Sequence, residues 1–461
     1  MTTLDLAPSG AGAPRVATDC FGHPKGLLYL AFAETWERFS YSGMQALLVL
    51  YMVEQLLLPG HVEHVAGFAA FRASVLAVTG PLTPAATASV IFGLYTGLVY
   101  VTPLIGGFLA DRWFGRTAMV TAGAILMAIG HFLMAFEASF LLALACLIVG
   151  VGGFKGNIST QVGALYAEGD HRRAQAFQVF YMGINVGLIF APLVCGTLGE
   201  RVGWHWGFGA AGVGMLVGLA IYLSGRRWLP PEPVRGASDE RIKPPALSRE
   251  EWLRTVALVG LLPILAGATL GNYQIFNTYL VWAKDSYDLS LFGQAMPVTW
   301  LLSFGGFTSV GLIALSVTFW NWWGRRWREP SELGKIAIGA AIMALAPLIL
   351  SAAAIRAQDG HKVSLGWAVA FELVNDLGYA NLVPVSYALF TRLAPPQIAG
   401  TMVAVCLLQF FLVNLMVGAL GTLLAPLGGP AFWLLHAAIV GGAAAVFMLL
   451  WRIFGARLAV S

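Results

Sequence analysis

The sequence predicts an all-α, polytopic membrane protein with about twelve transmembrane helices in two six-helix bundles. Of the 461 residues, 58% are hydrophobic and only 11% are charged, a balance that a soluble domain of this size does not have. Long apolar runs recur along the chain, and a helix of about 20 such residues crosses a hydrocarbon core of about 30 Å. Transmembrane β-barrels alternate apolar and polar residues over about ten positions, so that class is excluded.

The helices are expected where apolar runs are bounded by charged and turn-forming residues. In the first half they fall near residues 27–53, 85–111, 117–136, 139–163, 175–199 and 206–224. In the second half they fall near residues 253–283, 296–323, 334–355, 364–391, 399–424 and 431–454. The predicted domains are a tail at 1–24, a bundle at 25–224, a linker at 225–252 and a second bundle at 253–461.

The tail and the linker lack the composition of packed structure. The tail is rich in Ala, Gly and Pro without an apolar core, which predicts a disordered cytoplasmic segment and not a cleaved signal. The linker combines repeated Arg and Lys with several prolines, so it can neither span a bilayer nor form a core. Two bundles joined by such a linker resemble the major facilitator superfamily, in which repeated halves hold the binding site between them.

Basic residues set the expected orientation. The predicted outside loops hold few of the 27 Lys and Arg residues, namely Arg72, Arg201, Lys284, Arg356 and Lys362. Because cytoplasmic loops are enriched in Lys and Arg, both termini are expected in the cytoplasm and the protein in the cell membrane.

Charged residues inside the predicted helices are the strongest functional signal. They are Glu34, Glu37 and Arg38 in the first helix, Lys155 in the fourth, and Glu372 and Asp376 in the tenth. Each costs at least about 2.5 to 3.5 kcal/mol at a helix centre, so each should be paired or face water. They could be ion pairs that lock the bundle, but their spacing favours a functional site.

The polar residues of the first helix share one face. Their spacing is i, i+3, i+4, i+7 and i+11, and they are Glu34, Glu37, Arg38, Tyr41 and Gln45. Lys155 lies in a glycine-rich run at 150–158, where a neighbouring helix can approach closely and bring a partner carboxylate within reach. Tyr181 and Asn185 also share one helix face. In the tenth helix, Glu372, Asp376 and Tyr379 do the same.

Charge balance suggests how these residues work. Two glutamates, one arginine and one lysine sum to zero when all are ionised, which is the least costly state for buried charge. Protonation of one glutamate unbalances the set by one positive charge and frees the lysine for an anionic group. Proton binding and substrate binding would then be linked.

Four segments of the first half resemble the signature motifs of the proton-dependent oligopeptide transporter family. Residues 34–41 (ETWERFSY) are similar to its ExxERF motif, and residues 106–116 (GGFLADRWFGR) to its helix 2 to 3 signature. Residues 152–159 (GGFKGNIS) are similar to its helix 4 lysine segment, and residues 180–187 (FYMGINVG) to its helix 5 signature. In the second half, residues 328–331 (REPS) and 391–395 (TRLAP) still resemble family landmarks.

The resemblance implies roles for individual residues. Proton coupling is implied for Glu34, Glu37 and Lys155. Substrate binding is implied for Arg38 and Lys155 at the peptide carboxylate, with Tyr41, Asn157, Tyr181, Asn185 and Trp300 around them. A gating or bracing role at a cytoplasmic helix end is implied for Asp111 and Arg116.

The tenth helix departs from the family pattern. An ungapped alignment places Tyr379 where the family has the glutamate that helps to hold the peptide amino group. An alternative register assigns that glutamate to Glu372 but needs a seven-residue insertion in a membrane helix. Asp376 is the first candidate for a replacement. The departure puts an ordinary di- or tripeptide substrate in doubt.

Three functions follow from these patterns. The first is a proton-coupled symporter for short peptides or peptide-like substrates, and the second is a divergent carrier for another small anion or a modified amino acid. The third, a membrane enzyme or receptor, has no metal cluster, nucleophile motif or soluble catalytic domain to support it. We therefore expect a transporter that is not an enzyme, with protons, a small-molecule substrate and membrane lipid as partners. No cofactor, metal or nucleic acid is expected, and the expected state is a monomer.

Overall fold

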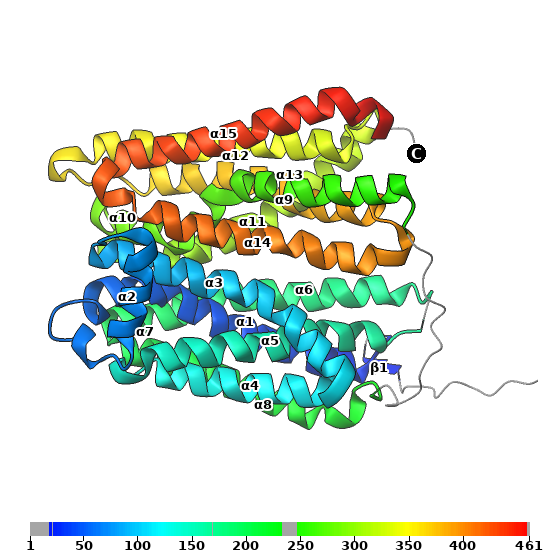
Figure 1. Ribbon diagram of the computed structural model, residues 1–461, viewed down its shortest axis with the longest axis horizontal. Coiled ribbons are helices and arrows are strands. Elements are labelled where there is room, and N and C mark those ends of the chain that lie inside the picture. Colours follow the sequence, from blue (N-terminus) through cyan, green and yellow to red (C-terminus); the bar gives the residue numbers. More distant parts are fainter. Residues whose placement is uncertain (1–17, 21, 168, 233–246, 459–461) are drawn as a thin grey trace, which may run out of the picture.

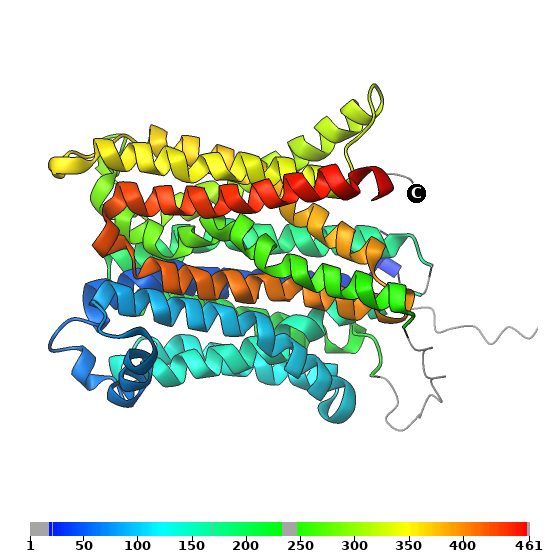
Figure 2. The ribbon, with the colours of Figure 1, turned by 45° about the horizontal axis from the view of Figure 1, so that its top comes forward.

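The computed structural model describes residues 18–20, 22–167, 169–232 and 247–458. Long helices run side by side along the longest axis of the molecule, and helices of the first half lie together on one side of those of the second (Figure 1). A view turned by 45° shows the same division (Figure 2). The predicted all-helical architecture is therefore confirmed in the described part of the chain.

The first half contains six long helices. Their bounds are α1 Lys25–Tyr51, α3 Pro84–Leu109, α4 Arg116–Leu133, α5 Phe140–Ala164, α6 Arg172–Ala191 and α8 Trp204–Ser224. A π-helical turn extends three of them, at Met52–Leu56, Ala110–Phe114 and Pro192–Gly196. Shorter helices are α2 Phe68–Thr79 and α7 Thr197–Arg201.

The second half repeats this plan. Its long helices are α9 Arg249–Tyr273, α11 Trp300–Gly324, α12 Glu332–Arg356, α13 Gly366–Leu393, α14 Ala399–Gly421 and α15 Leu424–Leu458. A 3₁₀ turn at Gln274–Phe276 separates α9 from the short α10 Thr278–Ser286. A small hairpin pairs β3 Ser290–Leu291 with β4 Gln294–Ala295.

Ten helical segments of the described residues are long and apolar enough to cross a membrane. The other two of the expected twelve are α1 and α13, with 27 and 28 residues. These two helices carry the acidic residues found inside the membrane helices, which makes them more polar than the rest. The chain is a multi-pass membrane protein, and the total of twelve spans stays a prediction.

Some boundaries differ from the expected ones. Helix α9 begins at Arg249 within the predicted linker, because Ser248 and Glu251 form a capping box with bonds of 3.2 and 2.8 Å. Helix α2 was not expected, since its 12 residues are too few to span a bilayer. The end of the predicted disordered tail pairs β1 Thr18–Cys20 with β2 His23–Pro24. Residues 1–17 of that tail and 233–246 of the linker lie outside the described residues.

Glycine contacts set the spacing of the helices around the predicted site. A side-chain carbon on Gly106 of α3 would overlap the carbonyl oxygen of Gly152 in α5. One on Gly123 of α4 would lie 2.5 Å from the carbonyl oxygen of Gly150. The glycine run of α5 therefore allows the close helix approach that the sequence predicts. Helix α5 thus packs closely against both α3 and α4.

The two halves are joined firmly at one end, which we call the outer end. There the carboxylate of Glu200 accepts hydrogen bonds from the backbone N–H groups of Val298 and Thr299, both 3.0 Å long, and from the Thr299 hydroxyl at 2.6 Å. Glu54 forms an ion pair with Lys284 across the same seam. We call these contacts the outer closure.

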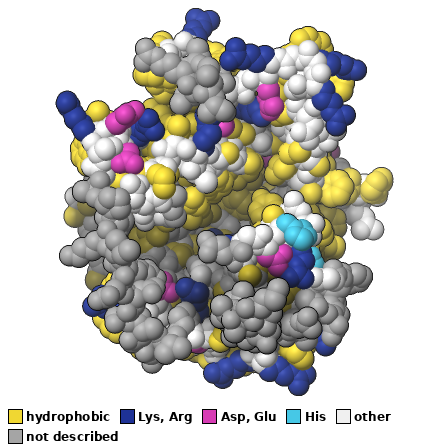
Figure 3. Space-filling model, turned by 90° about the vertical axis from the view of Figure 1, so that its right-hand side faces the viewer, with side chains coloured by type: hydrophobic (Ala, Val, Ile, Leu, Met, Phe, Trp, Pro, Cys, Tyr) yellow, Lys and Arg dark blue, Asp and Glu magenta, His cyan; other side chains and the backbone are white. Residues whose placement is uncertain are grey.

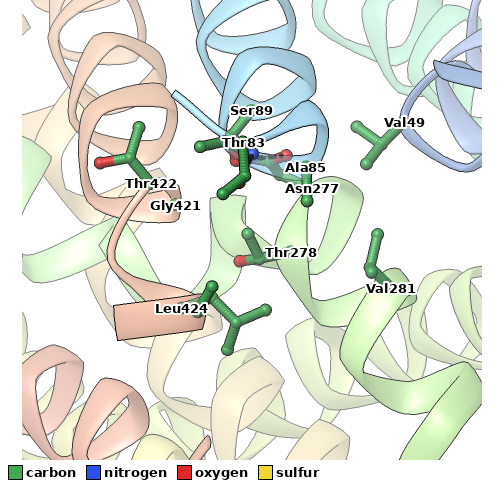
Figure 4. Close-up of a pocket in the computed structure, with 12 residues that line it drawn as sticks. Val49, Thr83, Ala85, Ser89, Asn277, Thr278, Val281, Gly421, Thr422 and Leu424 are labelled. Carbon is green, nitrogen blue, oxygen red and sulfur yellow. Dashed lines mark hydrogen bonds between the residues drawn. The ribbon is translucent and has the colours of Figure 1, made fainter. Parts of the chain in front are cut away.

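A small cavity of about 190 Å³ is lined by residues of both halves. Figure 4 shows Ser89 of α3 beside Asn277, with Thr278 and Thr422 around the same space. The Ser89 hydroxyl donates to the Asn277 side-chain oxygen over 3.0 Å, and the Asn277 amide donates to Val417 O over 3.3 Å. These polar contacts join the two halves beside the cavity.

The opposite end, which we call the inner end, carries β1 and the end of α15. Figure 3 looks onto this end and shows a surface hollowed between the two halves, with hydrophobic side chains in the hollow. Lys and Arg side chains stand around its rim. The protein is therefore closed at the outer end and hollowed at the inner end.

Candidate functional site

The charged face of α1 is buried and internally paired. Arg38 Nε lies 3.2 Å from Glu34 Oε1, and an Arg38 terminal nitrogen lies 2.5 Å from Glu37 Oε2. The exposed fractions are 2% for Glu34, 0% for Glu37 and 8% for Arg38. One guanidinium therefore serves two carboxylates, which leaves this trio with a net negative charge. A buried trio of this kind needs a second cation nearby.

Lys155 of α5 supplies that cation. Its Nζ lies 4.9 Å from the centre of the Tyr100 ring and 5.8 Å from that of Tyr41. Glu34, Glu37 and Arg38 are all electrostatic neighbours of this ammonium. The lysine thus faces the polar stripe of α1 and not the lipid.

The expected direct pairing of Lys155 with an acid of α1 is not found. No carboxylate oxygen of a described residue lies within 4.0 Å of its ammonium. Both carboxylates already contact the Arg38 guanidinium, so the ammonium is held over two aromatic rings by cation–π attraction. It has not been neutralised by direct contact with an acid.

Each glutamate of α1 keeps one oxygen that has no hydrogen-bond partner among the described residues. These buried oxygens are Glu34 Oε2 and Glu37 Oε1. A carboxylate has two oxygens and can take a proton on one while the other still accepts a bond. Either glutamate can therefore be protonated without breaking its contact with Arg38.

Aromatic side chains from both halves meet beside Lys155. The ring centre of Phe410 in α14 lies 5.2 Å from that of Tyr100, 5.3 Å from that of Tyr273 and 6.4 Å from that of Tyr387. The sequence reading missed Tyr100, Tyr273 and Phe410. Tyrosines in the middle of apolar helices, as Tyr100 and Tyr273 are, could have indicated them, because a buried phenol needs a polar partner.

The acids of α13 lie apart from this cluster, against α11. Glu372 is fully buried, and no described residue donates a hydrogen bond to either of its carboxylate oxygens. Asp376 is 3% exposed, and the Thr308 hydroxyl lies 2.5 Å from its Oδ2. Both acids therefore face the interior of the second half.

Comparison with known proteins shows that the sequence belongs to one family. The POT family model matches residues 117–239. An uncharacterized transporter of Bacillus subtilis, YclF, is 31% identical over 449 residues, which cover 86% of each chain. The peptide transporter YePEPT of Yersinia enterocolitica is 30% identical over 475 residues, covering 87% of this chain and 88% of its own. The chain belongs to the POT family.

A solved structure agrees with this assignment. The crystal structure of a peptide transporter POT in complex with sulfate has a TM-score of 0.82 and 26% sequence identity. The match covers 96% of this chain and 98% of that one. The architecture of a POT family transporter therefore extends over both halves, including the more divergent second half.

The residues that resemble the family motifs are brought together in part. Glu34, Glu37, Arg38, Tyr41 and Lys155 form one cluster. Helix α6 approaches it closely, because a side-chain carbon on Gly187 would lie 2.8 Å from both Arg38 Cβ and Phe39 N.

Tyr181 and Tyr379 lie near the aromatic side chains that meet beside Lys155. Tyr181 of α6 is 54% exposed and is an electrostatic neighbour of Tyr379 in α13. Tyr379 also lies near Tyr100 and Tyr273. This placement fits the register in which Tyr379 faces the site and Glu372 does not. The Asn185 amide donates to Tyr181 O over 2.8 Å.

Two predicted substrate contacts lie elsewhere in this conformation. The Asn157 amide donates to Gly153 O over 2.8 Å and to Gly106 O over 3.4 Å, so it ties α5 to α3. Trp300 Nε1 donates to the Thr197 hydroxyl over 2.8 Å and belongs to the outer closure. Sequence spacing located both residues in the right helices but could not show which partners their polar groups would find.

The residues predicted to gate or brace the inner end, Asp111 and Arg116, lie in contact, and their role stays a prediction. Arg116 forms an ion pair of 3.1 Å with Asp111. The linker residue Glu232 accepts hydrogen bonds from the backbone N–H groups of Arg116 at 3.0 Å and Thr117 at 2.7 Å. Burial raises the pKa of Glu232, but these bonds and the Arg116 charge outweigh it and hold that pKa below its ordinary value. The carboxylate thus caps α4 and attaches the linker to it.

Proposed function

We propose that this protein is a proton-coupled symporter that imports di- and tripeptides or peptide-like molecules by alternating access. The single observation that carries the proposal is the position of Lys155. No carboxylate of a described residue directly contacts its ammonium, which lies over Tyr41 and Tyr100 beside a buried Glu–Glu–Arg trio. Family membership supports the same function, since relatives include proteins named peptide transporters.

Substrate binding follows from the cations of the first half. A peptide carboxylate is an anion that Lys155 can bind as a point charge, with Arg38 close by. The tyrosine rings of both halves provide the apolar and hydrogen-bonding walls that a short peptide needs. Tyr41, Tyr181 and Tyr379 are the proposed wall residues, with Asn185 beside them.

Coupling follows from charge balance. Glu34, Glu37, Arg38 and Lys155 sum to zero when ionised, and one added proton makes the sum +1. A bound substrate carboxylate restores zero, so each ligand lowers the cost of binding the other. A proton moving down a membrane potential supplies about 2.3 kcal/mol per 100 mV. Glu34 and Glu37 are the proposed proton carriers because each keeps a free buried oxygen.

Alternating access requires two ends that open in turn. The outer closure and the hollowed inner end fit one of the two conformations. The basic rim of the inner end favours a cytoplasmic position for that end, with both termini inside and the protein in the cell membrane. We further propose that the protein acts as a monomer, without a cofactor or enzymatic activity.

A second candidate is a carrier for another small anion or a modified amino acid. It is favoured by the second half, where Tyr379 faces the site while Asp376 is bonded to Thr308 and Glu372 is buried. In this conformation neither acid is presented to a substrate amino group. Recognition of an amino terminus by Asp376 or Glu372 therefore stays a prediction.

Uptake into proteoliposomes under an imposed pH gradient separates the two candidates. Free amino acids, dipeptides, tripeptides and N-acetylated dipeptides are compared at equal concentration. Preferred accumulation of di- or tripeptides, abolished by a protonophore, supports the peptide symporter. Accumulation of single amino acids or small organic anions without peptides supports the second candidate instead.

A further inference from the structure

Two acids of α13 have no part in the coupling cluster of the first half. Glu372 and Asp376 lie one helical turn apart, and both face α11. A side-chain carbon on Gly305 of α11 would lie 2.9 Å from Glu372 Oε2. The carboxyl group of Glu372 thus occupies the space that this glycine leaves open.

The bonds around Thr308 indicate a proton on Asp376. The Thr308 hydroxyl oxygen lies 2.5 Å from Asp376 Oδ2 and 3.0 Å from Gly305 O. A hydroxyl has a single proton, and both of these neighbours are acceptors when Asp376 is ionised. If Asp376 carries a proton, it can donate to Thr308 while Thr308 donates to Gly305, and both contacts are then satisfied.

Among the described residues, no cation pairs with Glu372 and no group donates a hydrogen bond to its carboxyl oxygens. Its titratable neighbours are Asp376 on the same helix and the phenols of Tyr279 and Tyr287. Helix α11 contains no charged residue, and the charged residues of α12 lie at its ends, namely Glu332, Lys335 and Arg356. An ionised carboxylate without a hydrogen bond or a cation is too costly at this depth, so the group is neutral here.

The same turn of α11 also contacts the first half. A side-chain carbon on Gly306 would lie 3.2 Å from Ile189 Cγ1 of α6. Neighbouring glycines of α11 thus meet the Glu372 carboxyl on one side and the first half on the other. Helix α11 begins at Trp300, next to Thr299, which bonds to Glu200. Gly305 follows Trp300 by about 7.5 Å along the helix, so the outer closure lies between the acids and the outer surface.

We propose that Glu372 and Asp376 form a second proton-binding site, which is uncharged while the outer end is closed and exchanges protons with the outer side when it opens. The inference rests on the proposed alternating access, but it concerns gating and not substrate coupling. A charge on Glu372 needs water or donors, which can reach it only if α11 moves. That movement separates Gly306 from Ile189 and loosens the outer closure. Protons on the pair therefore stabilise the outer-closed conformation.

Infrared spectroscopy of the purified full-length protein tests the site directly. At neutral pH the protein should show a carbonyl band of protonated carboxylic acid that is diminished in Glu372→Gln and unchanged in Glu137→Gln. Glu372→Asp keeps a carboxylic acid and should shift the position of the carbonyl band. This shift is the measurement to use if Glu372→Gln does not fold. A band that neither substitution at Glu372 alters overturns the proposal.

Labelling of the outer seam tests the link to gating. A cysteine replaces Thr278 in a variant without the native cysteines, and a membrane-impermeant maleimide is added from the outer side. At alkaline pH, Glu372→Gln should lower the labelling rate several-fold relative to its parent, because the amide mimics the protonated acid. An equal or higher rate overturns the gating role. The parent could fail to take up peptides while the infrared band and the change in labelling rate are both observed. That outcome would contradict the proposed function and not the second proton-binding site.

Discussion

The ammonium group of Lys155 lies 4.9 Å from the centre of the Tyr100 ring. Such a contact stabilises a cation by about 0.5 to 2 kcal/mol, less than a buried ion pair with a carboxylate. Tyr100 thus holds the lysine in position without neutralising it, and an arriving substrate carboxylate can offer the stronger partner.

Replacement of Lys155 by alanine should remove the cation that an arriving substrate carboxylate binds. Uptake driven by a pH gradient is expected to fall by at least about tenfold, which corresponds to about 1.4 kcal/mol, because no second cation then balances the two glutamates. The measurement is initial uptake of a labelled dipeptide into proteoliposomes. Lys362→Ala, at an exposed position of the second half, serves as the matched control. If the Lys155→Ala variant took up the dipeptide at the wild-type rate, Arg38 alone would be sufficient to bind the substrate carboxylate.

Loss of the Glu200 carboxylate should open the outer end. It accepts three hydrogen bonds across the seam, and bonds to a charged group contribute about 1.5 to 3 kcal/mol each. Glu200→Ala is therefore expected to raise maleimide labelling of a cysteine at position 278 by about tenfold or more. Glu63→Ala is the control, since Glu63 bonds only to Gly60 in its own loop. Equal labelling in both variants would exclude Glu200 from the closure.

The linker contact of Glu232 should depend on pH. Its pKa is lowered in the folded protein, so the carboxylate stabilises the structure above the ordinary value of 4.5 and loses that contribution as the pH falls through the folded value. At pH 7 the thermal unfolding midpoint of wild type should exceed that of Glu232→Gln by a few degrees at most, because the group is partly exposed. The difference should shrink below pH 4.5. A difference that does not change with pH would contradict the capping role.

Two adjacent glycines of α3 provide a matched pair for packing. A side-chain carbon on Gly106 would overlap Gly152 O, whereas one on Gly107 would meet nothing within 4 Å. Gly106→Ala is expected to cost about 1 to 3 kcal/mol, as overpacking does, and to displace α5 with its lysine. Gly107→Ala should be close to neutral. The measurement is thermal stability in detergent, and equal midpoints would show that the two helices can separate without loss.

Sequence patterns predicted the parts of the structure that depend on solvent and on spacing. Apolar runs located the long helices because lipid requires continuous helices in which all backbone groups are bonded. The spacing of Glu34, Glu37 and Arg38 located the buried stripe, because residues three and four apart share a helix face. The glycine run of α5 indicated the close approach of a neighbouring helix, and the structure identifies α3 and α4 as the helices that approach it.

Other features required coordinates because they depend on which partner a group finds among several. Lys155 was expected to contact an acid, but Arg38 takes both carboxylates and the lysine lies over tyrosines. Trp300 joins the outer closure and Asn157 bonds to backbone carbonyls. Helix α2 is too short for a span, so no pattern used to find membrane helices detects it.

Proton binding and substrate carboxylate binding are proposed to occur together in one cluster of the first half. The most direct measurement follows dipeptide entry and internal pH in the same proteoliposomes, with no gradient imposed at the start. Dipeptide entry is expected to acidify the interior, and Glu37→Gln is expected to abolish this acidification. Dipeptide entry without any change of internal pH would contradict the proposed joint binding.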